Sequence, residues 1–313
     1  MKKIVVIGGG TGTYTVLKGL KKYDVELSAV VSMTDDGGST GRLRDEHGVL
    51  PPGDIRRCIV ALSESTELMK ELFQHRFSNG GLKGHSFGNL LITALTDITG
   101  SDDKAIKEAC RLLSIRGKVI PVTLNDRRLC AELEDGQIVF GETNIDIPKH
   151  DGNLSIKRLF LNKKAEANND ALEAIKSADL IVIGPGDLYS SVVCNFLVDG
   201  MKEAVMKSKA KKVYVCNLMT KHGETNGFTV SDFLREAEKY IGNDSIDYVL
   251  VNNAELDLAI LKEYEKEKDF PVKIDYETLK YWNKTFVFEN LVAGPRLIRH
   301  DPDRLAMQLM KLL

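Results

Sequence analysis

The stretch whose residue types are best suited to chemistry runs from Met33 to Arg57. It reads M-T-D-D-G-G-S-T-G-R-L-R-D-E-H-G-V-L-P-P-G-D-I-R-R. It combines carboxylates, guanidinium groups and glycines, and it lacks the apolar run that an ordinary core element needs. Long segments without secondary structure inside a compact domain are usually either functional loops or disordered. A buried-strand pattern at Leu27–Val31 leads into the stretch, and an amphipathic-helix pattern at Asp54–Leu62 leaves it. We therefore predict a ligand-binding loop pinned between a strand and a helix.

The adjacent carboxylates of Asp35 and Asp36 are compatible with three roles. They could hold Mg²⁺, with substrate phosphate completing the coordination shell. They could accept hydrogen bonds from sugar hydroxyls, or they could cap their own turn with Asx hydrogen bonds. Arg42 and Arg44 follow a few residues later and could pair a diphosphate in bidentate fashion.

A second chemical signal is the glycine turn G-G-G-T-G at Gly8–Gly12, which follows the β-branched run Lys3–Ile7 and precedes the helical spacing of Thr13–Lys22. Glycines at such a turn allow main-chain N–H groups to approach a phosphate at the helix N-terminus, where the helix dipole favours an anion. Thr13 stands where a dinucleotide fingerprint has its third glycine, which disfavours a nicotinamide-dependent oxidoreductase, and the chain has no P-loop pattern. We predict phosphate or nucleotide binding at this turn.

Further predicted strands end in the same kind of residue. The runs Leu180–Ile183, Lys212–Cys216 and Tyr248–Val251 are followed by glycines or asparagines. In an open parallel sheet all these ends lie along one edge, and ligands bind there at the point where the strand order reverses. Main-chain amides of the glycine turns suit phosphate oxygens, whereas asparagine amides can both donate to and accept from a base or sugar edge.

A second glycine-rich loop, Gly80–Asn89, opens another predicted helix. Ser86 or His85 could cap that helix. His85, Ser86 and Asn89 could equally line a binding site, and the residues alone leave both possibilities open.

The order of the patterns predicts one α/β domain over residues 1–313 with a doubly wound parallel sheet. A helical stretch follows the central loop, and alternation around Asp135-Gly136 indicates a β-hairpin. With a further strand at Ile156–Leu161, this gives a small antiparallel insertion at about residues 118–162. Helical spacing also predicts helices at Glu67–Phe77, Asp102–Ser114, Asn168–Ser177 and Ser231–Ile241.

Composition limits the class of protein. The 313 residues are 43% hydrophobic and 28% charged, with a net charge of −2 and a pI near 6.3, so there is no basic footprint for nucleic acid. No apolar run is long enough for a membrane span, and the N-terminus lacks the pattern of a signal peptide. The five cysteines are widely spaced and form no C-x-x-C pair, which predicts reduced thiols, no zinc site and a cytoplasmic location.

Several motifs together resemble one family. They are G-G-G-T-G, M-T-D-D-G-G-S-T-G-R-L-R followed by L-P-P-G-D-I-R, H-S-F-G-N-L, G-P-G-D-L-Y-S-S, C-N-L-M-T-K-H-G-E-T-N-G-F-T-V-S-D and V-N-N. In this order, from Ile4 to about Asn253, they look like the bacterial gluconeogenesis-factor (YvcK) family, which is related to the CofD 2-phospho-L-lactate transferases. The resemblance implies a Rossmann-like fold that binds a nucleotide sugar such as UDP-N-acetylglucosamine. It also implies a regulatory role that links precursor supply to cell-wall synthesis and cell shape.

The transferase relatives place acidic residues of the central loop around a divalent metal, and only part of that acidic set matches here, at Thr34-Asp35-Asp36 and Asp54. We therefore expect a UDP-sugar-binding regulatory protein, without an established cofactor and assembled as a homo-oligomer. The alternative is a metal-dependent 2-phospho-L-lactate transferase-like enzyme that acts on a nucleotide diphosphate, with Mg²⁺ held by Asp35 and Asp36. The residues expected at the ligand are Gly9, Gly10, Thr11, Gly12, Thr34, Asp35, Asp36, Arg42, Arg44, Asp54, His85, Ser86, Asn89, Gly184, Pro185, Gly186, Asp187, Ser190, Asn217, Asn252 and Asn253.

Overall fold

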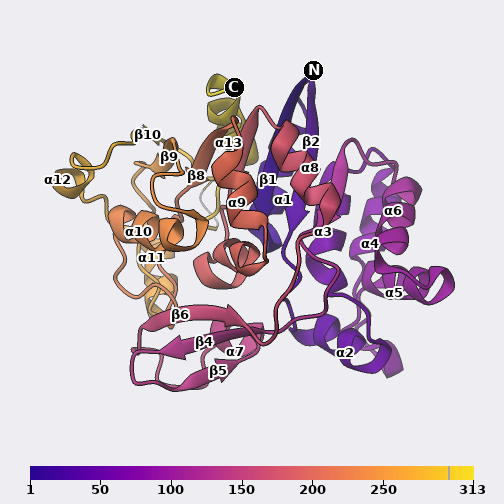
Figure 1. Cartoon of the computed structure of the whole chain (residues 1–313). Coiled ribbons are helices and arrows are strands. Elements are labelled where there is room, and N and C mark those ends of the chain that lie inside the picture. Colours follow the sequence, from indigo (N-terminus) through magenta and orange to yellow (C-terminus); the bar gives the residue numbers. More distant parts are fainter. Residues whose placement is uncertain (295–296) are drawn as a thin grey trace.

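The fold is built on a large parallel sheet with helices on both faces (Figure 1). The computed structural model describes residues 1–294 and 297–313. Its seven-stranded sheet has the order β10-β9-β8-β7-β1-β2-β3, and every neighbouring pair is parallel. The strands are β1 (Lys2–Gly8), β2 (Val25–Val31), β3 (Lys118–Pro121), β7 (Leu180–Ile183), β8 (Lys211–Val215), β9 (Tyr248–Asn252) and β10 (Thr285–Glu289).

The strand order reverses beside β1. From β1 the chain adds β2 and then β3 on one side, and it returns to add β7, β8, β9 and β10 on the other side. The doubly wound α/β sheet expected from the sequence is therefore confirmed. Its topological switch point lies between β1 and β7, which is where open α/β sheets form their ligand crevice.

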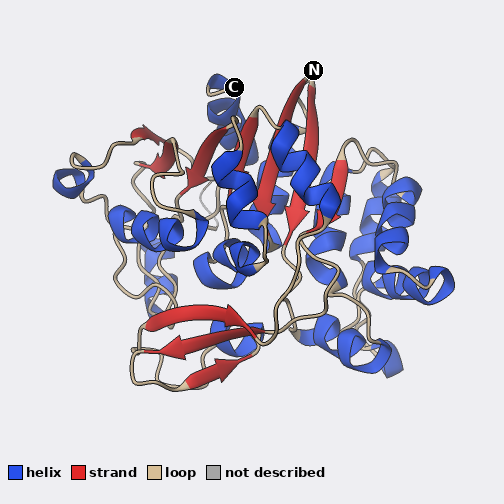
Figure 2. Ribbon diagram, viewed as in Figure 1, coloured by secondary structure: helices blue, strands red, loops and turns tan. Residues whose placement is uncertain are grey.

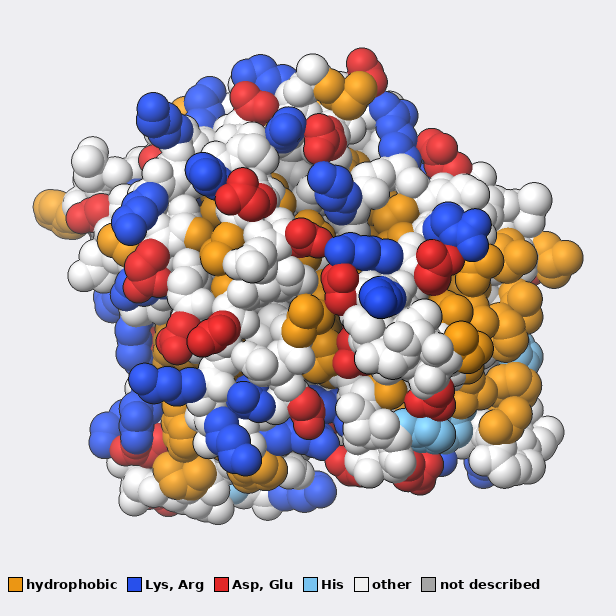
Figure 3. Space-filling model, turned by 45° about the vertical axis from the view of Figure 1, so that its right-hand side comes forward, with side chains coloured by type: hydrophobic (Ala, Val, Ile, Leu, Met, Phe, Trp, Pro, Cys, Tyr) orange, Lys and Arg blue, Asp and Glu red, His pale blue; other side chains and the backbone are white. Residues whose placement is uncertain are grey.

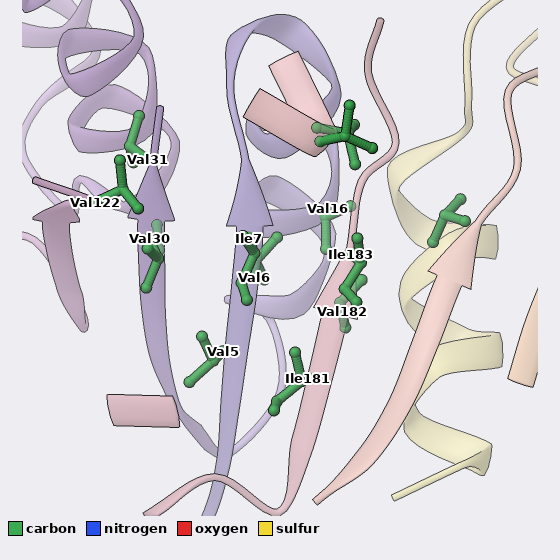
Figure 4. Packing of buried hydrophobic residues seen from close by; sticks show 14 of the residues in the cluster. Val5, Val6, Ile7, Val16, Val30, Val31, Val122, Ile181, Val182 and Ile183 are labelled. Atoms are coloured by element: carbon green, nitrogen blue, oxygen red, sulfur yellow. The ribbon is translucent and has the colours of Figure 1, made fainter. Parts of the chain in front are cut away.

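The core explains why the two central strands are continuous apolar runs. Ile4–Ile7 of β1 and Leu180–Ile183 of β7 are at most 2% exposed, because helices cover both faces of the sheet. Figure 4 shows β1 residues beside Ile181–Ile183 of β7, with Val16 of α1 (Gly10–Leu20) packed on them. On this face α1 also contacts α3 (Pro52–Leu62) and α13 (Pro302–Lys311), while α8 (Asn169–Ser177) and α9 (Met201–Lys207) lie on the other.

The expectation of a structureless loop over residues 33–57 is wrong in its middle, where α2 (Gly38–His47) forms. The sequence pattern misses this helix because it is mostly polar. The side chains of Leu43 and Arg44 are buried on one side of α2. Gly48, with φ of +68°, ends the helix in the left-handed conformation. Further helices are α4 (Glu67–Gln74), α5 (Phe87–Thr99), α6 (Asp102–Leu112), α10 (Val230–Ile241), α11 (Leu258–Lys266) and α12 (Tyr276–Leu279).

A small antiparallel sheet faces the carboxyl ends of the large one (Figure 2). It has the order β5-β4-β6, with β4 (Leu129–Leu133) and β5 (Ile138–Phe140) joined by the predicted hairpin and β6 (Ile156–Leu161) on the other side. The insertion begins later than residue 118, because β3 pairs in parallel with β2 and belongs to the large sheet. A helical turn, α7 (Glu142–Asp146), follows β5. Across residues 1–294 and 297–313, every helix is too short or too polar to cross a bilayer.

Candidate functional site

Two glycine turns meet at the switch point. Gly9–Gly12 follows β1, and Gly184–Gly186 follows β7. A Cβ on Gly12 would lie 2.0 Å from the carbonyl oxygen of Pro185, so only glycine allows the two turns to pack together. Gly10 has φ of +61°, a left-handed conformation that glycine adopts without strain. Both predicted phosphate turns are thus brought to one point by the sheet topology.

The N-terminus of α1 opens onto this point. The helix begins after Gly9, which has no side chain with which to cap the first N–H groups. These donors and the helix dipole form an anion-binding corner. Arg57 of α3 adds positive charge there, because its Nη1 donates to the Thr11 hydroxyl at 3.2 Å and a Cβ on Gly10 would lie 3.8 Å from the same nitrogen.

A cleft extends from the glycine turns along the ends of β7, β8 and β9. It consists of a cavity of about 340 Å³ beside Gly12 and Gly186 and a cavity of about 250 Å³ beside Asn252 and Asn253, and the two share Asn217 and Leu218. We call these two cavities the switch-point cleft. Further residues lining the first cavity are Thr11, Pro185, Asp187, Lys221, Tyr264 and Arg299.

The asparagines at the strand ends have different roles. Asn217 donates to the Gly186 carbonyl at 2.8 Å, and its own side-chain oxygen accepts no hydrogen bond from the described residues. Asn252 is engaged within the fold, because it accepts from the Leu291 amide at 3.0 Å and donates to the Ala254 carbonyl at 3.3 Å. Asn253 is exposed. The free Asn217 oxygen is buried, so the exposed side chain of Asn253 is the more accessible amide of the switch-point cleft.

On the other side of the glycine turns lies an acidic cluster of Asp35, Asp36, Asp54 and Glu142. A Cβ on Gly9 would lie 2.7 Å from Asp54 Oδ2, and a Cβ on Gly53 would lie 2.8 Å from Asp35 Oδ2, so the glycines make room for the carboxylates. Asp35 accepts from the Gly37 amide at 2.9 Å, which is the Asx turn considered from the sequence. Asp36 accepts from the Thr143 amide at 2.9 Å.

Burial and neighbouring carboxylates raise the pKa values of Asp35, Asp54 and Glu142. Burial, followed by the charge of Asp35, raises the pKa of Asp54 to about 6. Burial and the charges of Asp35, Asp146 and Asp36 raise the pKa of Glu142 to about 9. The pKa of Asp35 is also raised, chiefly by burial. Glu142 was not anticipated from the sequence, since a glutamate after a hairpin strand carries no signal that α7 packs against the switch point.

The arginines are arranged differently from the prediction. Arg44 is 3% exposed and braces the central loop, because its guanidinium donates to the carbonyls of Asp35 at 2.7 Å and Arg127 at 2.8 Å and pairs with Asp126. Arg42 is exposed and donates to the Lys83 carbonyl at 2.9 Å. The arginine beside the glycine turn is therefore Arg57.

Three residues of the second glycine-rich loop make hydrogen bonds within the fold. The Ser86 hydroxyl caps α5 by accepting from the Asn89 amide at 3.4 Å. Asn89 accepts from Arg56 Nε at 2.8 Å, and buried His85 shares a hydrogen bond of 2.9 Å with Ser39. Thr34, another expected ligand residue, shares a hydrogen bond with Ser32 at 3.1 Å.

A second group of carboxylates surrounds a lysine at the cleft. Asp146, Asp187 and Glu224 offer oxygens within 4.8 Å of one another, which is metal-ligand spacing. However, Lys221 Nζ lies among them, 3.1 Å from Asp187 and 3.6 Å from Glu224, and it also pairs with Asp146. Ser190 contributes a hydrogen bond of 3.4 Å to Glu224. The ammonium group already neutralises part of this negative charge, so we assign the group as an ion cluster that ties α7 to the cleft.

Comparison with known proteins places the chain. The family profile of the 2-phospho-L-lactate transferase CofD matches residues 4–292, which include both glycine turns and both carboxylate clusters. The chain belongs to the CofD family. Within this family it is 48% identical to the gluconeogenesis factor of Halalkalibacterium halodurans, over 99% of this chain and 96% of the relative. It is 43% identical to the gluconeogenesis factor of Bacillus subtilis, over 99% of this chain and 98% of the relative.

The fold of the family agrees with that of this chain. A crystal structure of a Bacillus halodurans protein matches with a TM-score of 0.95 and 44% identity, over 99% of both chains. The family resemblance expected from the motifs is thereby confirmed. Arg299, which lines the switch-point cleft, lies beyond the residues that the CofD family profile matches. The sequence did not predict Tyr264 and Arg299 as cleft residues, because neither follows a strand or belongs to a glycine-rich motif.

Proposed function

We propose that this chain binds a nucleotide diphosphate sugar, UDP-N-acetylglucosamine or a close analogue, and acts in the cytoplasm as a regulator. Its role would be to balance cell-wall precursors and maintain cell shape under gluconeogenic growth. The proposal rests mainly on the switch-point cleft, which begins at the glycine-rich N-terminus of α1 with Arg57 beside it and continues to the exposed amide of Asn253. The relatives named gluconeogenesis factor support the proposed role in gluconeogenic growth.

Each part of the ligand has a matching group. The diphosphate would accept hydrogen bonds from the main-chain amides of Gly9–Gly12, with Arg57 neutralising its charge. The amide of Asn253 would pair with the base or ribose, and Tyr264 and Arg299 line the adjoining cavity. Sugar hydroxyls would donate to the carboxylates of Asp35 and Asp54, which lie on the opposite side of the glycine turn.

Isothermal titration with UDP-N-acetylglucosamine, UDP and GDP would test this proposal. We expect the UDP-sugar to bind with similar affinity in EDTA and in Mg²⁺, because Arg57 and the helix N-terminus supply the positive charge. Absence of binding to all three ligands under both conditions would contradict nucleotide binding at the cleft. A strict Mg²⁺ requirement, or release of UMP or a phosphoryl product with a deazaflavin acceptor, would contradict the regulator and support the transferase.

The transferase alternative has one specific observation in its favour. Asp35, Asp54 and Glu142 lie together beside the phosphate turn, where burial, followed for Asp54 and Glu142 by the charge of Asp35, raises their pKa values, so a bound cation would stabilise their ionised forms. Asp35 and Asp54 fit one or two carboxylate ligands of Mg²⁺, with substrate phosphate completing the shell. A bound ion would neutralise charge developing on the leaving group. The CofD match supports the same alternative.

We also propose that the chain forms a homo-oligomer through an apolar face on α4 and α5. Leu68 is 75% exposed and Ile98 is 80% exposed, and Figure 3 shows hydrophobic side chains gathered on this side of the molecule. Asp97 is the one charged residue of α5, so a second copy would bring little like-charge repulsion. Light scattering after size exclusion should show a dimer or larger assembly, and Ile98→Asp should dissociate it. A monomeric parent would contradict the proposal.

A further inference from the structure

A cavity of about 590 Å³, larger than either part of the switch-point cleft, lies at the opposite end of the sheet. Its floor comes from the amino-terminal halves of β1 and β2 and from the whole of β3, and its walls come from α6 and α8. Because the strands are parallel, their amino ends are remote from the glycine turns at their carboxyl ends. Among the described residues, this amino-end cavity and the switch-point cleft share no lining residue.

The local backbone explains why this space stays open. The turn before β3 contains Gly117, with φ of +117°, and a Cβ there would lie 2.5 Å from the Leu27 carbonyl oxygen. The turn is thus held against β2 by a residue that has no side chain to fill the gap. On the other side, Lys107 of α6 reaches Asp103 at 2.9 Å and Asp170 of α8 at 3.0 Å, which bridges the two helices across the space.

The inner surface is mainly apolar. Val5, Ile120 and Ala174 contribute hydrocarbon, and Cys110 lies among them. Burial raises the pKa of the Cys110 thiol to about 12, so the thiol stays neutral and behaves as a small hydrophobic group. A volume of this size with apolar walls and a few polar groups is typical of a small-molecule site.

The charges at the rim are separated along the strands. At the amino end, Lys3 and Lys118 each lie 3.9 Å from Glu26, so two cations share one carboxylate. At the other end, Lys107 is shared by Asp103 and Asp170, so two carboxylates share one cation. We call the lysine-rich end the positive pole and the aspartate-rich end the negative pole. The positive pole attracts an anion and the negative pole repels one, and the apolar walls lie between them. Figure 3, in which this side of the molecule is turned forward, shows both signs of charge interspersed with hydrophobic side chains.

We propose that the amino-end cavity is a second ligand site, which takes a small amphipathic carboxylate. The apolar body would lie against Val5, Ile120 and Ala174, and the carboxylate would be at Lys3 and Lys118. The carboxylate is placed at this end because only the positive pole carries a net positive charge. The site is independent of nucleotide binding, because it lies at the other end of the sheet.

Cys110 provides a built-in reporter. It is half-buried in the cavity, whereas Cys58, Cys130, Cys194 and Cys216 are at most 2% exposed. Only the small thiolate fraction of Cys110 reacts with a maleimide, so we would use excess maleimide at pH 9 and compare rates with and without a probe, with octanoate as the probe and octylamine as its cationic counterpart. Octanoate at saturation should slow modification at least tenfold, while octylamine should leave the rate nearly unchanged. Equal protection by both probes, or none by octanoate, would overturn the proposal.

Two variants locate the binding. Lys118→Glu reverses one charge at the positive pole and should weaken octanoate binding at least tenfold, which is about 1.4 kcal/mol. Lys163→Glu, an exposed charge reversal near the small sheet, is the matched control and should change nothing. Ala174→Trp should fill the cavity and abolish octanoate binding measured by calorimetry. Unaltered octanoate affinity in folded Lys118→Glu or Ala174→Trp would place the probe elsewhere and refute the site.

Discussion

Replacing Asp54 by Asn should stabilise the protein at neutral and alkaline pH, although the substitution removes a conspicuous polar group of the site. The carboxylate of Asp54 lies in the first turn of α3 and is held near that of Asp35. Burial and this neighbour raise its pKa from 3.8 to about 6. The folded state therefore holds the proton more tightly than the unfolded state does. This tighter proton binding stabilises the folded state fully below pH 3.8, and the stabilisation is lost as the pH rises through about 6.

The size of the effect follows from linkage. With these two pKa values, ionisation of Asp54 costs the folded state about 1.6 kcal/mol at pH 5 and about 3 kcal/mol at pH 8. Asparagine removes this cost and also forgoes the favourable interaction of a carboxylate with the helix N-terminus, worth about 0.3–1 kcal/mol. The net gain for Asp54→Asn should therefore be about 1 kcal/mol at pH 5 and about 2 kcal/mol at pH 8.

Urea unfolding at both pH values, followed by circular dichroism and by fluorescence of Trp282, would measure the difference in free energy of unfolding. Glu203→Gln, an exposed substitution on α9 outside the acidic cluster, is the control, and its effect should not grow with pH. An Asp54→Asn protein that is less stable than the parent at pH 8 would refute the reasoning. So would a difference that stays constant between the two pH values.

Three other substitutions separate binding groups from structural ones. Arg57→Met should weaken UDP-sugar binding at least tenfold in calorimetry, since loss of a partner for the diphosphate costs about 2–5 kcal/mol, whereas Arg42→Met should change it less than threefold. Arg44→Met should lower the free energy of unfolding by at least about 3 kcal/mol, because several buried acceptors and Asp126 lose their donor. Lys221→Met should destabilise the protein by about 3–5 kcal/mol at pH 8, because three carboxylates lose their cation. The loss should be smaller at pH 5, where some of these carboxylates bind protons. Equal losses of unfolding free energy at both pH values would refute this.

Much of the architecture could be predicted from the sequence because it depends on local patterns. The apolar run of β1, the glycine turn and the 3.6-residue spacing of α1 occur within about twenty residues, and each has a direct physical cause in burial or backbone freedom. The hairpin at Asp135-Gly136 is local in the same way, with Gly136 at φ of +87°. By contrast, whether Lys118–Pro121 joins the small sheet or pairs with β2 depends on a partner far away in the chain, and the run itself fits either sheet.

The sequence by itself determined that glycine turns, aspartates and an asparagine follow parallel strands, and hence that they meet at one edge of a sheet. Only the tertiary structure decided which groups lie together at that edge. It places Arg57 rather than Arg44 beside the turn, and it brings Tyr264 and Arg299 to the cleft from segments without a binding motif. It also sets the protonation of Glu142, whose pKa of about 9 results from burial beside carboxylates of other segments. Periodicity and turn chemistry are properties of neighbouring residues, whereas burial and charge repulsion exist only between groups that folding brings together.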